Sequence, residues 1–160
     1  MEQEMFTLAV QQYQDMVFRI ALHYFADPDD ADDAVQEVFL RLFQRKTGFD
    51  SEEHMKHWLM RVTVNHCKDI LKSPWRKRRV GMESAENLPV FDKPEQMVLF
   101  QEVMSLSEKY RTVLYLFYYE ELTVKEIASV LKLRQSAVTT RLSRARALLK
   151  KRLGEAWNNE

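Results

Sequence analysis

The sequence lacks the several cysteines that stabilise small secreted proteins and the long apolar runs that anchor proteins in membranes. It contains one cysteine in 160 residues, which excludes an internal disulfide and is typical of a reducing cytoplasm. No apolar run approaches the roughly 20 residues that cross a bilayer, and the acidic, polar N-terminus is unlike a signal peptide. We therefore expect a cytoplasmic protein without direct membrane insertion.

Glycine is also scarce, with only three residues, and the apolar residues recur at helical rather than alternating spacing. This pattern predicts an all-α fold. A capping box of Thr123 and Glu126 is expected to open one helix. The other helices are predicted over residues 5–25, 28–43, 52–72, 94–106, 107–119 and 135–156.

The helical periodicity is interrupted once, after the third predicted helix. Residues 73–93, "SPWRKRRVGMESAENLPVFDK", contain two prolines and a glycine and have no repeating apolar pattern. We therefore expect two small helical domains, over residues 1–75 and 94–160, joined by a flexible linker over residues 76–93.

The net charge of the whole chain is zero, but acidic and basic residues are concentrated in different segments. Residues 1–40 carry a net charge of −8 and residues 80–110 carry −4, whereas residues 41–79 carry +7 and residues 111–160 carry +5. Two separated basic blocks predict two nucleic-acid footprints, although either block alone could be a solvated surface.

The second basic block contains "LTVKEIASVLKLRQSAVTTRLSRARALLKK", residues 122–151, which has the pattern of a helix-turn-helix. On its second helix an apolar side that includes Val138, Leu142 and Ala145 would pack on the first helix. The remaining surface carries short hydroxyls, which let a helix lie deep in a major groove, and arginines, which can bond guanine edges. These predicted duplex contacts are Ser136, Thr139, Thr140, Arg141, Ser143, Arg144 and Arg146.

The second predicted helix has an apolar residue in an unexpected place. Leu40 falls on the polar side with Asp33, Gln36 and Glu37, opposite the apolar side of the helix. A leucine surrounded by acidic residues is typical of a protein-binding patch, although single exposed leucines are common.

The third predicted helix combines aromatic, amide and basic side chains in one stripe. Trp58, Arg61, Asn65, Lys68 and Lys72 recur on one side, and "PWRKRR" follows. Such a stripe suits single-stranded nucleic acid, because bases stack on rings while cations follow the backbone. The preceding loop could hold a flipped base. Trp58 could equally be a core residue.

Taken together, "DADDAVQEVFLRLF", "HWLMRVTVNHCKDIL" and "LSEKYRTVLYLFYYEELTVKEIASVLKLRQSAVTTRLSRARALLKKRL" resemble the extracytoplasmic-function (ECF) sigma factors of bacterial RNA polymerase. This is the small two-domain branch of the sigma-70 family, and the resemblance covers nearly the whole chain in order. It implies a transcription initiation factor that is not an enzyme and uses no cofactor or small-molecule substrate. The implied partners are core RNA polymerase, promoter DNA and an anti-sigma factor.

The resemblance also implies roles for individual positions. The residues expected to bind core polymerase are Asp32, Asp33, Gln36, Glu37, Phe39, Leu40 and Phe43. Those expected to hold the unpaired −10 strand are Phe49, Ser51, Glu52, Met55, Trp58, Arg61, Asn65, Lys68, Lys72 and Arg76. The helix-turn-helix is expected to read the −35 element as duplex and to promote transcription together with the −10 contacts.

Two positions depart from the family pattern in the predicted turn. Lys132 stands where a small residue is usual, and a left-handed conformation there would cost about 1 kcal/mol. Arg134 stands where a helix-capping residue is common. Both residues are expected to affect the geometry with which the second helix of the helix-turn-helix meets the −35 element.

Two other classes of protein remain as alternatives. A stand-alone helix-turn-helix regulator would bind a palindrome as a dimer, without polymerase. An enzyme is the other class, with His54, His57, His66 and Cys67 as its candidate metal or redox site. No nucleophile–base arrangement and no glycine-rich phosphate loop is recognisable in the sequence.

Overall fold

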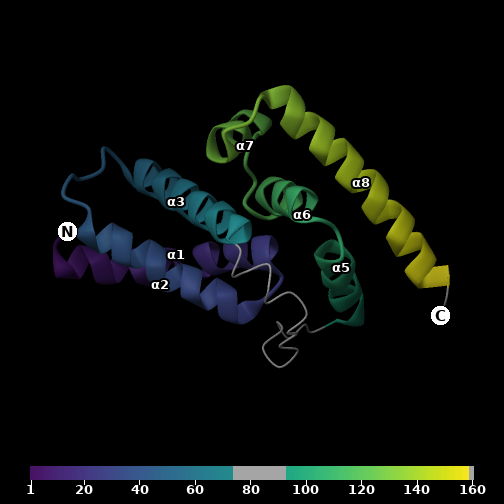
Figure 1. The fold of residues 1–160 in the computed structure, drawn as a ribbon, viewed down its shortest axis with the longest axis horizontal. Coiled ribbons are helices and arrows are strands. Elements are labelled where there is room, and N and C mark those ends of the chain that lie inside the picture. Colours follow the sequence, from purple (N-terminus) through teal and green to yellow (C-terminus); the bar gives the residue numbers. More distant parts are fainter. Residues whose placement is uncertain (74–92, 159–160) are drawn as a thin grey trace. The chain divides into compact units, whose positions relative to one another are not determined.

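The computed structural model describes residues 1–73 and 93–158, with side chains placed in the second range as far as residue 155. Every regular element within these ranges is helical, which confirms the predicted all-α class (Figure 1). The chain divides into two compact units, Met1–Asn87 and Leu88–Glu160. The predicted linker, apart from Lys93, lies outside the described residues, and so does Arg76.

The first unit is a group of three helices: α1 (Gln3–Phe25), α2 (Pro28–Gln44) and α3 (Glu52–Lys72). Each of the three packs against the other two. Their shared core includes Ile20, Val38 and Leu59, each at most 1% exposed. Burying one such side chain contributes about 1.5–3 kcal/mol, so the apolar stripe of each helix holds the unit together.

Local sequence signals set where these helices begin and end. Ala26 ends α1 in a left-handed conformation with φ 54°, and its N–H bonds to the Leu22 carbonyl at 2.8 Å. Asp27 then caps α2, because its Oδ1 accepts from the Asp29 N–H at 2.9 Å. Ser51 caps α3 in the same way, accepting from the His54 N–H at 3.1 Å.

The second unit contains α5 (Pro94–Met104), α6 (Glu108–Leu114), α7 (Val124–Leu131) and the long α8 (Gln135–Asn158) (Figure 1). α8 packs against α5, α6 and α7. The predicted capping box is present: Thr123 Oγ1 accepts from the Glu126 N–H, and Glu126 Oε1 accepts from the Thr123 N–H, both at 3.1 Å. No helix in the described parts of the chain is long and apolar enough to span a bilayer.

The predicted helix over residues 107–119 is not uniform. After α6 the backbone widens into a π-helical turn, η2 (Tyr115–Tyr119), and the Glu120 N–H bonds five residues back to the Tyr115 carbonyl at 3.2 Å. The turn places Tyr118 and Tyr119 on the surface, each 58% exposed. An inserted π turn shifts the register of apolar residues by one position, which the 3.6-residue periodicity of the sequence does not reveal.

Candidate nucleic-acid and polymerase interfaces

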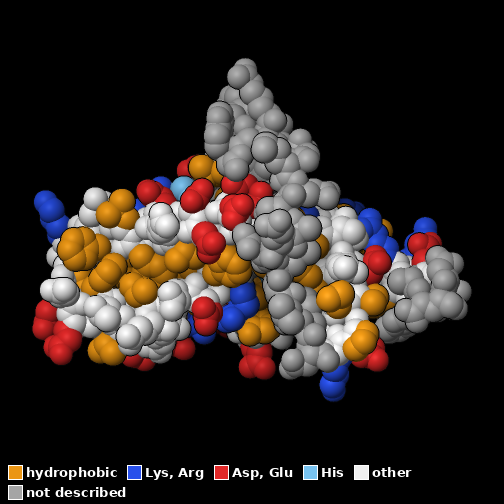
Figure 2. Space-filling model, turned by 90° about the horizontal axis from the view of Figure 1, so that it is seen from below, with side chains coloured by type: hydrophobic (Ala, Val, Ile, Leu, Met, Phe, Trp, Pro, Cys, Tyr) orange, Lys and Arg blue, Asp and Glu red, His pale blue; other side chains and the backbone are white. Residues whose placement is uncertain are grey.

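The outer face of α2 carries two large exposed apolar side chains among acidic and amide residues. Leu40 is 49% exposed and Phe43 is 50% exposed, while Asp32, Asp33 and Gln36 are also on the surface. The apolar side chains of the first unit form a band along one of its faces (Figure 2). The Phe43 and Phe6 rings pack edge to face with centroids 5.2 Å apart, so the apolar surface extends from α2 onto α1.

Phe39 does not share this exposed face. It is 5% exposed and belongs to the core. Successive helical residues lie 100° apart, so Phe39 turns inward beside Val38 while Leu40 turns outward. The expectation that Phe39 is part of the partner-binding surface is therefore corrected: its side chain lies in the core of the first unit.

Glu37 connects the α2 face to α3 through Arg41. Arg41 Nε donates to Glu37 Oε1 at 3.0 Å, and Arg41 Nη2 lies 3.5 Å from His66 Nδ1 on α3. Burial lowers the pKa of His66, and the positive charge of Arg41 lowers it further, against the opposing effects of Glu37 and Asp69. The imidazole is thus kept neutral, with a ring nitrogen able to accept a hydrogen bond from Arg41.

The loop between α2 and α3 is organised by Arg45, which the sequence analysis did not single out. Its Nε donates to the Thr47 carbonyl at 3.0 Å and its Nη2 to the Gly48 carbonyl at 3.5 Å. The guanidinium carbon lies 4.2 Å from the Phe49 ring centroid and 5.0 Å from that of Trp58. One arginine therefore fixes both the loop backbone and two aromatic rings.

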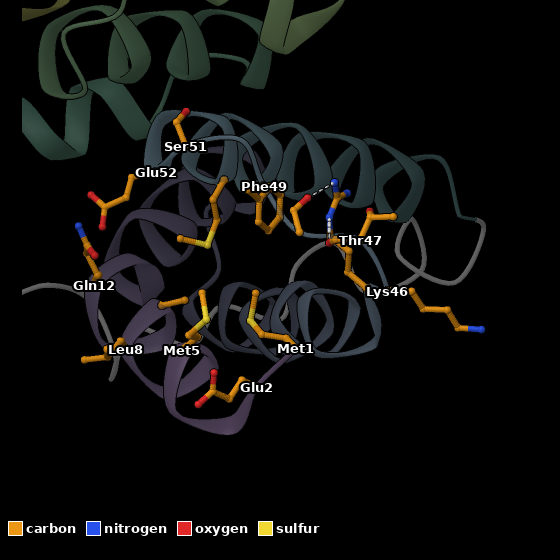
Figure 3. Close-up of a pocket in the computed structure, with 14 residues that line it drawn as sticks. Met1, Glu2, Met5, Leu8, Gln12, Lys46, Thr47, Phe49, Ser51 and Glu52 are labelled. Atoms are coloured by element: carbon orange, nitrogen blue, oxygen red, sulfur yellow. Dashed lines mark hydrogen bonds between the residues drawn. The ribbon is translucent and has the colours of Figure 1, made fainter.

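The structure brings together four of the residues predicted to hold the −10 strand. Phe49, Ser51, Glu52 and Met55 line one groove of about 430 Å³ (Figure 3). Its opposite side is formed by the N-terminal turns of α1, a contribution that local sequence patterns do not reveal. The groove lies beside Arg45 and Lys46, so cationic groups are available at its edge.

Trp58 is neither a core residue nor an isolated surface ring. It is partly exposed and meets Phe49 edge-on with centroids 5.6 Å apart. The rest of the α3 stripe follows it along the helix: Arg61 and Lys72 are exposed, and Asn65 and Lys68 are partly exposed. The stripe thus begins at the loop and continues along one side of α3.

The histidine and cysteine side chains of α3 do not assemble into a metal centre. His54 Nδ1 accepts from the Asp50 N–H at 3.1 Å. Cys67 is buried, and burial raises the pKa of its thiol, which disfavours the thiolate that binds metals. Over residues 1–73 and 93–155, no group of three or more histidine, cysteine or acidic side chains is placed to hold a metal ion.

In the second unit, α8 has the two sides that the sequence predicts. Val138, Leu142 and Ala145 are at most 2% exposed, and the facing Ile127 and Leu131 of α7 are equally buried. The outward residues Ser136, Thr139, Thr140, Ser143 and Arg144 are exposed, and Arg141 is partly exposed. The helix thus presents short hydroxyls and arginine to the surface while its other side holds it on α7.

The Arg146 side chain contacts two aromatic residues of the π turn. Its Nε donates to the Tyr118 hydroxyl at 2.5 Å, and its guanidinium carbon lies 5.3 Å from the Phe117 centroid and 5.5 Å from that of Tyr118. Arg146, which is predicted to contact the −35 element, is exposed and also joins α8 to the π turn. Sequence spacing gave no sign of this, because 28 residues separate the two partners.

The turn between α7 and α8 confirms the conformation considered for Lys132. The residue has φ 55° and ψ 49°, in the left-handed region, and its N–H bonds to the Ala128 carbonyl. The Leu133 N–H bonds to the same carbonyl at 3.0 Å. Arg134 directly precedes α8, and its carbonyl accepts from the N–H groups of Ala137 and Val138.

Comparison with known proteins gives a consistent result for both units. Residues 9–77 match the model of sigma-70 region 2, and residues 97–149 match that of sigma-70 region 4. The chain is 28% identical to the ECF RNA polymerase sigma factor SigW of Bacillus subtilis (strain 168), over 95% of this chain and 90% of that protein.

Two solved structures share the fold. The sigma factor RpoE of Bartonella quintana, solved with the anti-sigma factor NepR, has a TM-score of 0.77 and 19% identity, over 93% of this chain and 96% of that one. CnrH, solved with the cytosolic domain of CnrY, has a TM-score of 0.68 and 24% identity, over 96% of this chain and 90% of that one. With region 2 and region 4 matched in order, the protein belongs to the sigma-70 family and is a sigma factor of the ECF type.

Proposed function

We propose that this chain binds core RNA polymerase, holds the −35 element as duplex through α8, and holds unpaired −10 bases through α3 and the loop before it. The observation that carries the proposal is that each unit presents its own surface with nucleic-acid-binding chemistry. The first has a groove and a basic, aromatic stripe, and the second has an outward helix face of hydroxyls and arginine. We assign −10 recognition and polymerase docking to a domain over residues 1–75, and −35 recognition to a domain over residues 94–160.

Docking on polymerase is assigned to the outer face of α2. Leu40 and Phe43 supply exposed apolar area, and Asp32, Asp33 and Gln36 supply charge and hydrogen-bonding groups around it. An apolar centre with a polar rim is the usual arrangement of a protein interface. The second unit would add contacts through α6, η2 and α7, where Tyr118 and Tyr119 are exposed.

Duplex reading is assigned to the outward face of α8. Because its hydroxyl-bearing residues are short, the helix backbone can approach base edges closely, and Arg144 is the arginine among them that can reach a guanine. Arg141 at the border of this face suits a phosphate. Strand capture is assigned to Phe49 and Trp58 for stacking and to Arg61, Lys68 and Lys72 for the backbone, with Asn65 available to a base edge.

Control by an anti-sigma factor is also proposed. Both solved neighbours were captured with a protein partner, the anti-sigma factor NepR in one case and the cytosolic domain of CnrY in the other. A protein that covers the face of α2 would prevent assembly with polymerase by occupying the same apolar area.

The test is a gel-shift on a promoter fragment, together with run-off transcription, with and without core polymerase. We expect weak promoter binding by the chain alone and strong binding and transcription with core, because each DNA surface by itself is small and gains from being held beside the other. Equal, specific binding without core by a dimeric chain would instead identify a stand-alone regulator.

A further inference from the structure

The groove beside the loop has a second wall that the proposed function does not use. Across from Phe49, Glu52 and Met55 lie Met5, Leu8 and Gln12 of α1. Figure 3 shows Met5 and Phe49 on opposite sides of the open space, with Gln12 and Glu52 together at one end of it. The groove is therefore formed by two segments that are some forty residues apart in sequence.

The apolar side chains of this wall are not needed to hold α1 in place. Met5 is 59% exposed and Leu8 is 61% exposed, whereas Ala9 and Tyr13, which anchor the same end of the helix, are 3% and 6% exposed. Two large apolar side chains on the surface cost solubility without adding to the core. Their position at a groove, rather than on a flat surface, indicates a ligand site.

The chemistry of the groove suits a single unpaired base. Methionine sulfur makes favourable contacts with aromatic rings, and Phe49 offers a ring edge or face on the other side. Gln12 and Glu52 can hydrogen-bond a base edge. Lys46, whose side chain points away from the groove in Figure 3, and Arg45 provide positive charge where the strand's phosphates would run.

We propose that Met5 and Leu8 of α1 form the second wall of the site for one unpaired −10 base and help to decide which base it accepts. This rests on the proposed function, in which the loop and α3 capture that strand. The groove is continuous with that surface, because Phe49, Ser51, Glu52 and Met55 belong to both. The α1 wall adds selection by shape, because a base would lie between the Met5 thioether and the Phe49 ring. The size of the base would then decide how well it fills the groove.

The first test is photo-crosslinking in the assembled holoenzyme. Leu8→p-benzoylphenylalanine places a photoreactive group at the rim of the groove. Gln11→p-benzoylphenylalanine is the control, since Gln11 is exposed on the same helix but does not line the groove. We expect position 8, and not position 11, to crosslink one non-template base of the −10 element in the open complex. Crosslinks from position 8 only to a polymerase subunit, or equal crosslinking from both positions, would overturn the assignment.

The second test measures base preference directly. Promoters carrying each of the four bases at each −10 position are opened with wild-type, Met5→Ala, Met5→Trp and Gln11→Ala holoenzymes. We expect Met5→Ala to reduce the preference at one position by about tenfold, as loss of a side chain from an apolar pocket does. Met5→Trp fills the groove and should block opening while −35 duplex binding persists, and Gln11→Ala should change neither.

The outcomes separate the two proposals. If the wild-type holoenzyme opens the promoter and both Met5 variants open it with unchanged base preference, α1 is not a wall of the base site, while the proposed function stands. If the wild-type chain with core polymerase opens no promoter, the proposed function fails and this inference fails with it.

Discussion

The candidate DNA surface of the second unit is carried by one helix, whereas that of the first unit is assembled from a loop and two helices. On α8 the reading residues are presented by a regular backbone, and their direction follows from the buried Val138, Leu142 and Ala145 on the other side. In the first unit the groove is lined on one side by the loop, where Arg45 lies over the Phe49 and Trp58 rings, and on the other side by α1. The first surface therefore depends on single side-chain contacts far more than the second does.

The two units are alike in one respect: each uses an arginine to hold an irregular segment against aromatic rings. Arg45 does so for the loop after α2, and Arg146 does so for the π turn, through the Tyr118 hydroxyl and the Phe117 ring. Both arginines therefore shape the backbone and the rings that they contact.

The largest effect is expected from a change on the outer face of α2, which we assign to neither promoter element. Leu40→Asp places a charge at the centre of the apolar face of α2, and a change at the centre of an interface costs about 2 kcal/mol or more, roughly thirtyfold in affinity. Co-purification with core polymerase and run-off transcription should both be lost. Gln14→Asp, which adds the same charge at an exposed position of α1, is the control. Retention of core binding by Leu40→Asp would place the docking surface elsewhere.

Arg144→Ala and Arg146→Ala should separate the recognition of −35 bases from the stabilisation of the second unit. Loss of Arg144 should reduce −35 discrimination at one base position by about 1–3 kcal/mol, because the proposed bidentate contact to a guanine would be removed. Loss of Arg146 should instead lower the stability of the second unit by about 1 kcal/mol, since a hydrogen bond and a ring contact disappear. Binding to a set of −35 variants and thermal unfolding measure the two effects. A uniform loss over all sequences would make Arg144 a phosphate contact.

Arg45→Lys should weaken the first surface and leave the second intact. Lysine keeps the positive charge but cannot make the forked bonds to the Thr47 and Gly48 carbonyls or lie flat on Phe49. A loss of about 1–2 kcal/mol follows from these contacts, or roughly tenfold in the formation of open complexes. Permanganate footprinting reports the opening, and duplex −35 binding should not change. Lys46→Arg, which alters the neighbouring residue while keeping its charge, should behave like wild type.

The smallest expected effect is a gain in stability at the turn before α8. Lys132 holds a left-handed conformation that glycine adopts without steric cost. Lys132→Gly should therefore stabilise the second unit by about 1 kcal/mol, with a rise in Tm of roughly 4–8 °C. Lys150→Gly, at an exposed position within α8, should have the opposite sign, because glycine weakens a helix interior. A fall in Tm with Lys132→Gly would show that the lysine side chain stabilises the second unit by more than the left-handed backbone destabilises it.

Much of the second unit could be predicted from local patterns. The capping box of Thr123 and Glu126 and the buried side of α8 both follow from spacing along a single helix. The patterns missed the π turn, whose hydrogen bond spans five residues, and the tie between Arg146 and Tyr118, which lie 28 residues apart. They also missed the burial of Phe39 beside the exposed Leu40.

The sequence by itself determined the helical class, the two-unit organisation and the chemical character of each surface, because helix periodicity, caps and charge are properties of neighbouring residues. Only the tertiary structure decided which of those residues meet. It placed Met5 of α1 across a groove from Phe49, set Arg45 on the Phe49 and Trp58 rings, and turned Arg146 toward the protein. Such contacts arise when helices pack, and packing joins segments whose separation along the chain carries no periodic signal.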